Sequence, residues 1–220
     1  MDGQEEGSVD FGQSFAYVFK DEEWFKKLSV GGLFVLLAMF IIGSFFVAGY
    51  ELEVMRRVMR RDRRPLPQWD DLGRKLGEGF MLMVAFLVYA VPIMIVSTFS
   101  DGDGGVLAAL MTLAFFLWVP AVQIQYARTS DFSACFRGAE IFQFVRSNLG
   151  TYVPAALLSI LVWGLAFSFG WLAFIIGWPW VIFWGSLVSS HILGQVGTLW
   201  SGPAPRPAAP PADAPQGSAQ

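Results

Sequence analysis

The 220-residue sequence has a single cysteine, Cys135, and a single histidine, His191. One thiol excludes an internal disulfide and a four-cysteine zinc site. A catalytic zinc ion normally needs three protein ligands, and one histidine with one cysteine does not provide the usual set. GxGxxG, Walker A and HExxH patterns do not occur in the sequence. The sequence therefore predicts no cofactor, no metal site, no catalytic residue and no enzymatic activity.

Charged residues are also scarce, at 15% of the chain, whereas 55% of the residues are hydrophobic. The mean hydropathy of +0.51 lies outside the range of ordinary soluble domains. The central parts of the apolar runs contain no Asp, Glu, Lys or Arg, the residues that side-chain proton relays and ion-coupling sites usually need. We therefore predict an all-α, polytopic helical membrane protein.

Apolar runs define the expected organisation, because about 20 apolar residues in a helix are needed to cross a bilayer. We expect about five transmembrane helices, at 29–50, 80–100, 106–126, 152–169 and 172–193. Apolar residues at helical spacing in 10–28 and 130–149 predict two interfacial amphipathic helices. The acidic segment 1–9 and the Pro/Ala-rich tail 201–220 are predicted to be disordered, on either side of one membrane domain at 10–200.

A basic segment at 51–79 separates the first two runs. Glu53 precedes Arg56 and Arg57 by three and four residues, the favourable order for ion pairs in a helix. One interpretation is a topogenic cytoplasmic loop that follows the positive-inside rule. The other is a contact site for anionic lipid, phosphate, nucleic acid or a protein partner, although we expect no nucleic acid. Its candidate residues are Arg56, Arg57, Arg60, Arg61, Arg63, Arg64 and Trp69.

Two topologies agree with a cytoplasmic 51–79 segment. Five spans leave Lys20, Lys26 and Lys27 outside and put the other twelve basic residues inside. Alternatively, 29–50 is a re-entrant hairpin that turns at Gly43-Ser44, four segments span the bilayer, and all fifteen basic residues lie inside. A broken backbone of this kind must be buried in protein.

The last predicted span carries small residues and the only histidine. Gly185, Ser189, Ser190 and Gly194 form a stripe suited to close helix packing. An ionisable residue in a membrane helix is a functional candidate, but no acid that could complete a triad lies near His191 in the sequence. We therefore expect His191 to make structural hydrogen bonds.

Several of these residues carry a family resemblance. Gly49-Tyr50-Glu51-Leu52 with Arg56-Arg57, then Leu66-Pro67-x-Trp69-x-Asp71 and Gly79, resemble the prokaryotic membrane proteins of domain-of-unknown-function family 4013. The similarity covers roughly residues 10–195 and excludes the tail. It implies a bacterial or archaeal integral membrane protein, and it brings no known activity and no catalytic residues.

Three functions remain open. The first is a noncatalytic scaffold, accessory or envelope protein of the cell membrane, whose cytoplasmic 51–79 segment binds anionic lipid or a protein partner. The second is a transporter or channel for a small neutral or lipidic solute, since prolines lie near or inside the later spans. The third, a membrane enzyme that depends on His191, has the least support.

Overall fold

The computed structural model describes residues 10–38, 42–99, 104–170 and 174–200, and within these ranges it is all-helical. In chain order the elements are α1 (Phe11–Ala16), the 3-10 helix η1 (Tyr17–Lys20), α2 (Trp24–Ala38), α3 (Ile42–Met59), α4 (Leu72–Phe99), α5 (Gly104–Thr129), the 3-10 helix η2 (Phe132–Phe136), α6 (Gly138–Ser147), α7 (Leu149–Gly170) and α8 (Phe174–Gly197). The predicted all-α class is thus confirmed for the described part of the chain. The two terminal segments for which we predicted disorder lie outside it.

Three helices of the described chain are long and apolar enough to cross a membrane, over Leu72–Thr98, Gly105–Thr129 and Leu149–Ser168. They correspond to the predicted spans 80–100, 106–126 and 152–169. Many large apolar side chains on these helices are exposed, including Leu87, Leu110 and Leu161. Such surfaces are typical of helices that face lipid. The predicted span 172–193 corresponds to α8, which is not among the three; residues 171–173 at its start are outside the described chain.

The predicted single helix over 29–50 is wrong. α2 ends at Ala38 and α3 begins at Ile42, and the two helices pack against each other. The two halves of the run differ in their contacts: α2 packs on α8, whereas α3 packs on both α4 and α8. Gly31 allows this approach, since a β-carbon there would overlap the Phe183 ring. The re-entrant alternative also needs correction, because its predicted turn at Gly43-Ser44 lies inside α3.

The two predicted amphipathic helices are each interrupted. Segment 10–28 contains α1, η1 and the first residues of α2, and Asp21 between η1 and α2 has an extended backbone with ψ 132°. Segment 130–149 contains η2, α6 and the first residue of α7, and Arg137 with ψ 66° separates η2 from α6. Asp131 caps the second segment, since its carboxylate accepts a hydrogen bond from the Ser133 amide. Within the 51–79 segment, only residues 60–71 are non-helical, because α3 continues to Met59 and α4 begins at Leu72.

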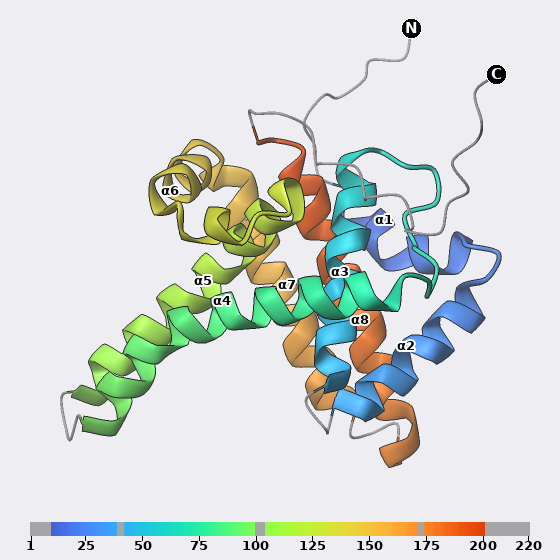
Figure 1. Ribbon diagram of the computed structural model, residues 1–220, viewed down its shortest axis with the longest axis horizontal. Coiled ribbons are helices and arrows are strands. Elements are labelled where there is room, and N and C mark those ends of the chain that lie inside the picture. Colours follow the sequence, from blue (N-terminus) through green and yellow to red (C-terminus); the bar gives the residue numbers. More distant parts are fainter. Residues whose placement is uncertain (1–9, 39–41, 100–103, 171–173, 201–220) are drawn as a thin grey trace, which may run out of the picture.

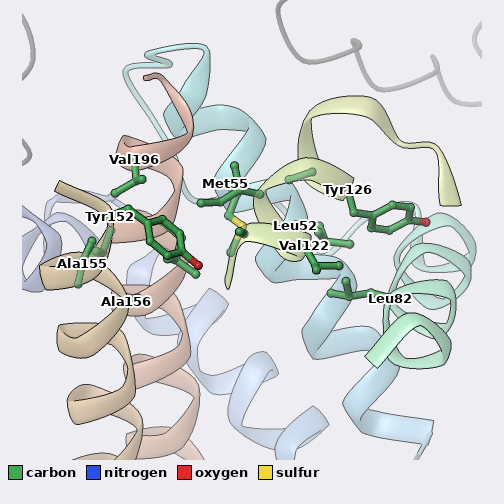
Figure 2. Packing of buried hydrophobic residues seen from close by; sticks show 14 of the residues in the cluster. Leu52, Met55, Leu82, Val122, Tyr126, Tyr152, Ala155, Ala156 and Val196 are labelled. Atoms are coloured by element: carbon green, nitrogen blue, oxygen red, sulfur yellow. The ribbon is translucent and has the colours of Figure 1, made fainter. Parts of the chain in front are cut away.

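The helices form a bundle with a projecting arm (Figure 1). α7 and α3 both pack on α8, while α4 crosses α3 and then runs beside α5 away from the bundle. The main hydrophobic core lies where the arm joins the bundle. Figure 2 shows Leu52 and Met55 of α3 between Val122 on one side and Tyr152 and Val196 on the other. This junction is therefore where most of the helices meet, and it adjoins the polar groups described next.

Candidate functional site

Charged side chains of α3 and α4 form a connected cluster, which we call the α3–α4 ionic cluster: Glu53, Arg56 and Arg57 on α3, with Arg74, Lys75 and Glu78 on α4. Glu53 is its centre. It contacts Lys75 at 2.9 Å, Arg57 at 2.9 Å and Arg74 at 3.0 Å. Burial would raise the pKa of the Glu53 carboxyl, but the three surrounding cations lower it below its usual value. Glu53 is therefore held as a carboxylate that joins the two helices.

Arg56 is one of two deeply buried cations of this cluster, with its side chain 2% exposed, beside Lys75 at 0%. Its Nη1 lies 2.6 Å from Glu78, and its Nε donates a 2.8 Å hydrogen bond to the carbonyl oxygen of Ala127 on α5. Arg56 thus ties α3 to both helices of the arm. Removing one partner of such a buried pair leaves an uncompensated charge, which is strongly destabilising.

The structure separates the six arginines that the sequence suggested as one contact surface. Arg56 and Arg57 are held in the cluster, and the exposed Arg64 lies 3.3 Å from Glu22. Arg60 pairs with Asp62 two residues later, at 3.5 Å. Arg61 and Arg63 are exposed, and no ion pair involves them within the described ranges. The exposed part of the predicted basic surface therefore consists of Arg60, Arg61, Arg63 and Arg64, and two of these are paired with acids.

Trp69, predicted as a contact residue for lipid or a partner, is half-buried and packs against neighbouring aromatic residues. Its ring stacks on Tyr50 at 4.3 Å and on Phe34 at 4.7 Å between centroids. Its indole nitrogen donates a 2.9 Å hydrogen bond to the carbonyl oxygen of Lys27. Tyr50 in turn donates to the carbonyl oxygen of Pro67. These contacts fix the 66–70 loop against the start of α2.

Glu51 differs from the other buried acids because no cation of the described residues forms an ion pair with it. It is 8% exposed, and it accepts a hydrogen bond from Gln123 on α5 at 3.3 Å. Burial raises the pKa of the Glu51 carboxyl to about 7, although its interactions with Ser186 on α8 and with Gln123 oppose this shift. Glu51 is therefore a buried group that can gain or lose a proton near neutral pH.

A comparison of the sequence with protein-family models matches residues 32–178 to the family described as "Protein of unknown function (DUF4013)". The match covers more than half of the chain. The chain belongs to the DUF4013 family. The resemblance identified from the sequence is thereby confirmed. No curated protein and no solved structure matches this DUF4013 chain.

His191, which follows the matched region in the sequence, joins the two ends of the described chain. Its Nδ1 lies 2.9 Å from the hydroxyl of Ser14, and its ring stacks on Tyr17. Gln195, one turn later on α8, accepts a 2.7 Å hydrogen bond from the Asp10 amide. Ser14 is completely buried, so this serine and histidine act as a structural link between α1 and α8.

The small residues predicted to form one stripe on α8 face two neighbours. A β-carbon at Gly185 would lie 2.8 Å from Ala166 on α7, whereas one at Gly194 would lie 2.8 Å from Val58 on α3. Ser189 and Ser190 are both buried. Close packing is therefore distributed over two sides of α8.

Across the part of the chain that the structure describes, no three His, Cys, Asp or Glu side chains are grouped to hold a metal ion. Sequence reasoning missed three residues of the polar interior: Glu51, Ser14 and Lys75. The sequence around these residues gives little indication of their contacts. Glu51 borders an apolar run, and Ser14 contacts His191, which lies 177 positions later. The Glu53-Arg57 spacing was the one local cue, and the structure confirms this pair.

Proposed function

We propose that this DUF4013 protein is a noncatalytic scaffold or accessory subunit of a prokaryotic cell membrane. The observation that carries the proposal is the contrast between two parts of the molecule. Helices α4, α5 and α7 expose large apolar side chains along their lengths, as helices in lipid do. By contrast, the charged groups of α3 and α4 neutralise one another in the α3–α4 ionic cluster.

The proposal includes that the protein has no enzymatic activity. The buried cations of the cluster are engaged in ion pairs, and the hydrogen bonds of His191 connect α1 to α8. Burial raises the pKa of the Cys135 thiol to about 12, which makes it a poor nucleophile. These arrangements support a role in holding neighbours together rather than in chemistry.

The exposed arginines Arg61 and Arg63 supply the proposed contact with a protein partner on the cytoplasmic side. The test is affinity purification of the tagged chain in mild detergent from its native membrane. The Arg61→Glu/Arg63→Glu double variant should lose the partner, whereas the exposed Arg146→Glu should retain it. Recovery of the tagged chain alone, or equal recovery of the partner with the double variant, would contradict the partner role.

The proposed orientation of the chain in the membrane is tested separately. The packing of α2 against α3, with helix ends at Ala38 and Ile42, supports a re-entrant first hairpin, and the charge distribution supports a cytoplasmic 60–71 loop. Single cysteines at Gly3 and Gly104 report the topology through a membrane-impermeant maleimide. Labelling from opposite sides agrees with the re-entrant hairpin. Labelling from the same side agrees with five spans.

A second candidate function is transport of a small neutral or lipidic solute, and Glu51 is the observation that favours it. A buried acid that has no ion-pair partner among the described residues is expensive to maintain in a membrane domain. In reconstituted vesicles, a transported solute should show a flux that Glu51→Gln reduces and Glu140→Gln leaves unchanged. No flux over a broad panel of solutes would remove this candidate.

A further inference from the structure

A small pocket opens between the start of α2 and the 66–70 loop. Its volume is about 220 Å³, and its lining residues are Lys26, Lys27, Val30, Gln68, Trp69 and Asp70. At about 30 Å³ for each water molecule, this volume corresponds to roughly seven waters, which is enough for a small polar headgroup. The network of Trp69 and Tyr50 described above holds the loop side of the pocket in place.

The lining offers one available charge of each sign. Lys27 is already used, because its ammonium contacts both oxygens of Asp21 and the carbonyl oxygen of Leu66. Lys26 is 72% exposed and lies 3.8 Å from Glu23, which is a weak surface pair. Asp70 is 69% exposed, and among the described residues only one of its two carboxylate oxygens lies near a cation, 3.3 Å from Lys75, which also donates to the Asp70 carbonyl oxygen. The pocket therefore suits a ligand with a negative and a positive end.

An apolar stripe continues from this pocket along α2. Val30, Leu33 and Leu37 follow Lys26 at intervals of four, seven and eleven residues, so all four lie on one side of the helix. Leu33 and Leu37 are both exposed, at 55% and 45%. A polar pocket at one end of an exposed apolar stripe matches the shape of a glycerophospholipid.

We infer that this pocket binds the headgroup of a phosphoethanolamine lipid. The phosphate accepts from the Lys26 ammonium, the lipid ammonium donates to the Asp70 carboxylate, and the acyl chains lie on Leu33 and Leu37. A phosphoglycerol headgroup has no cation for Asp70. A phosphocholine headgroup has no N–H to donate to it. This inference rests on the proposed membrane location, but not on the scaffold role.

The test uses the full chain purified in mild detergent and titrated with dioleoyl lipids in native mass spectrometry. The wild type should retain the phosphoethanolamine lipid about tenfold better than the phosphoglycerol or phosphocholine lipid. Lys26→Gln and Asp70→Asn should each remove this preference, a loss of about tenfold for one charge-assisted contact. Lys20→Gln, which changes an exposed lysine away from the pocket, is the matched control and should behave as the wild type.

Further binding measurements distinguish the possible negative results. Soluble glycerophosphoethanolamine should bind much more weakly than the lipid, and Leu33→Asn should weaken only the lipid. Equal binding of the soluble headgroup would overturn the lipid assignment, and unchanged preference in both charge variants would overturn the pocket. Because Lys26 is exposed, Lys26→Gln should fold normally. A chain that is folded and monodisperse without detergent would instead contradict the membrane proposal itself.

Discussion

A β-carbon built on Gly79 of α4 would lie 2.8 Å from the amide nitrogen of Gly49 on α3. It would also overlap the carbonyl oxygen of Phe45, and a β-carbon on Gly49 would overlap that of Lys75. The backbones of α3 and α4 therefore touch where these helices cross, directly beside the α3–α4 ionic cluster. Both glycines belong to the sequence pattern that resembles the family. The close approach of the two backbones explains why the pattern has glycine at these positions.

The first prediction concerns this crossing. Gly79→Ala should destabilise the fold by about 1–3 kcal/mol, because the added methyl group meets backbone that has no freedom to move away. Gly77→Ala is the matched control, since nothing lies within 4 Å of a β-carbon there. The control should be neutral or stabilising by up to about 1 kcal/mol, because alanine favours a helix over glycine. Thermal unfolding in detergent measures both, and equal stability of the two variants would contradict the backbone contact.

The second prediction concerns the buried pair of Arg56 and Glu78. Arg56→Met should lower the free energy of unfolding by about 1–3 kcal/mol, because the half-buried Glu78 loses its closest cation but keeps Arg74 at 3.4 Å. The Arg56→Met/Glu78→Leu double variant should regain part of this loss. Arg64→Gln, which removes only an exposed pair, should change stability by no more than about 0.5 kcal/mol. A small effect of Arg56→Met would mean that the cluster does not join the helices.

The third prediction concerns the pH dependence that Glu51 introduces. Because its pKa is raised from 4.5 to about 7 in the fold, the folded state binds more protons than the unfolded chain between these values. The contribution of Glu51 to stability should therefore be largest below pH 4.5 and should fall as the pH rises toward 7, by about 3 kcal/mol in total.

The measurement for Glu51 is a comparison with Glu51→Gln, which keeps an acceptor for Gln123. Subtracting the two unfolding profiles between pH 4 and pH 8 isolates the contribution of this carboxyl from that of all other groups. The variant should gain stability relative to the wild type as the pH rises. Parallel profiles would show that Glu51 does not titrate in this window.

The fourth prediction concerns Cys135. Its thiol is buried and its pKa is raised to about 12, so almost no reactive thiolate is present at pH 7.5. Maleimide should label the native chain at least about a hundredfold more slowly than it labels an Arg63→Cys variant. Unfolding in denaturant should remove this difference. Rapid labelling of the folded wild type would contradict the burial of the thiol.

The parts of the fold that could be predicted are those fixed by local sequence. Uninterrupted apolar runs of sufficient length gave α4, α5 and α7, because a helix in lipid needs only its own backbone hydrogen bonds and apolar side chains. The break between Ala38 and Ile42 has no such cue. The whole run is apolar, and what divides it is the packing of α2 on α8 and of α3 on α4.

The candidate site was harder to predict because its partners are distant in sequence. The spacing of Glu53 and Arg57 predicted their pair, but Arg56 joins Glu78 22 residues later rather than Glu53. Trp69 has the amphipathic ring of an interfacial residue, yet Tyr50 and Phe34 enclose it. An arginine-rich segment thus looks like open surface until the acids that neutralise it are located in three dimensions.

The link between the N-terminal segment and α8 also sets the order in which the molecule can be completed. Asp10 and Gln195 are separated by 185 residues, so at translation rates of about 5–20 residues per second the ribosome needs roughly 10–40 s to supply the second partner. During that interval Ser14 and Tyr17 lack the hydrogen-bond partners that His191 and Leu187 of α8 provide in the complete fold. The segment that is synthesised first is among the last to reach its final position, and truncation before α8 would leave it without a docking site.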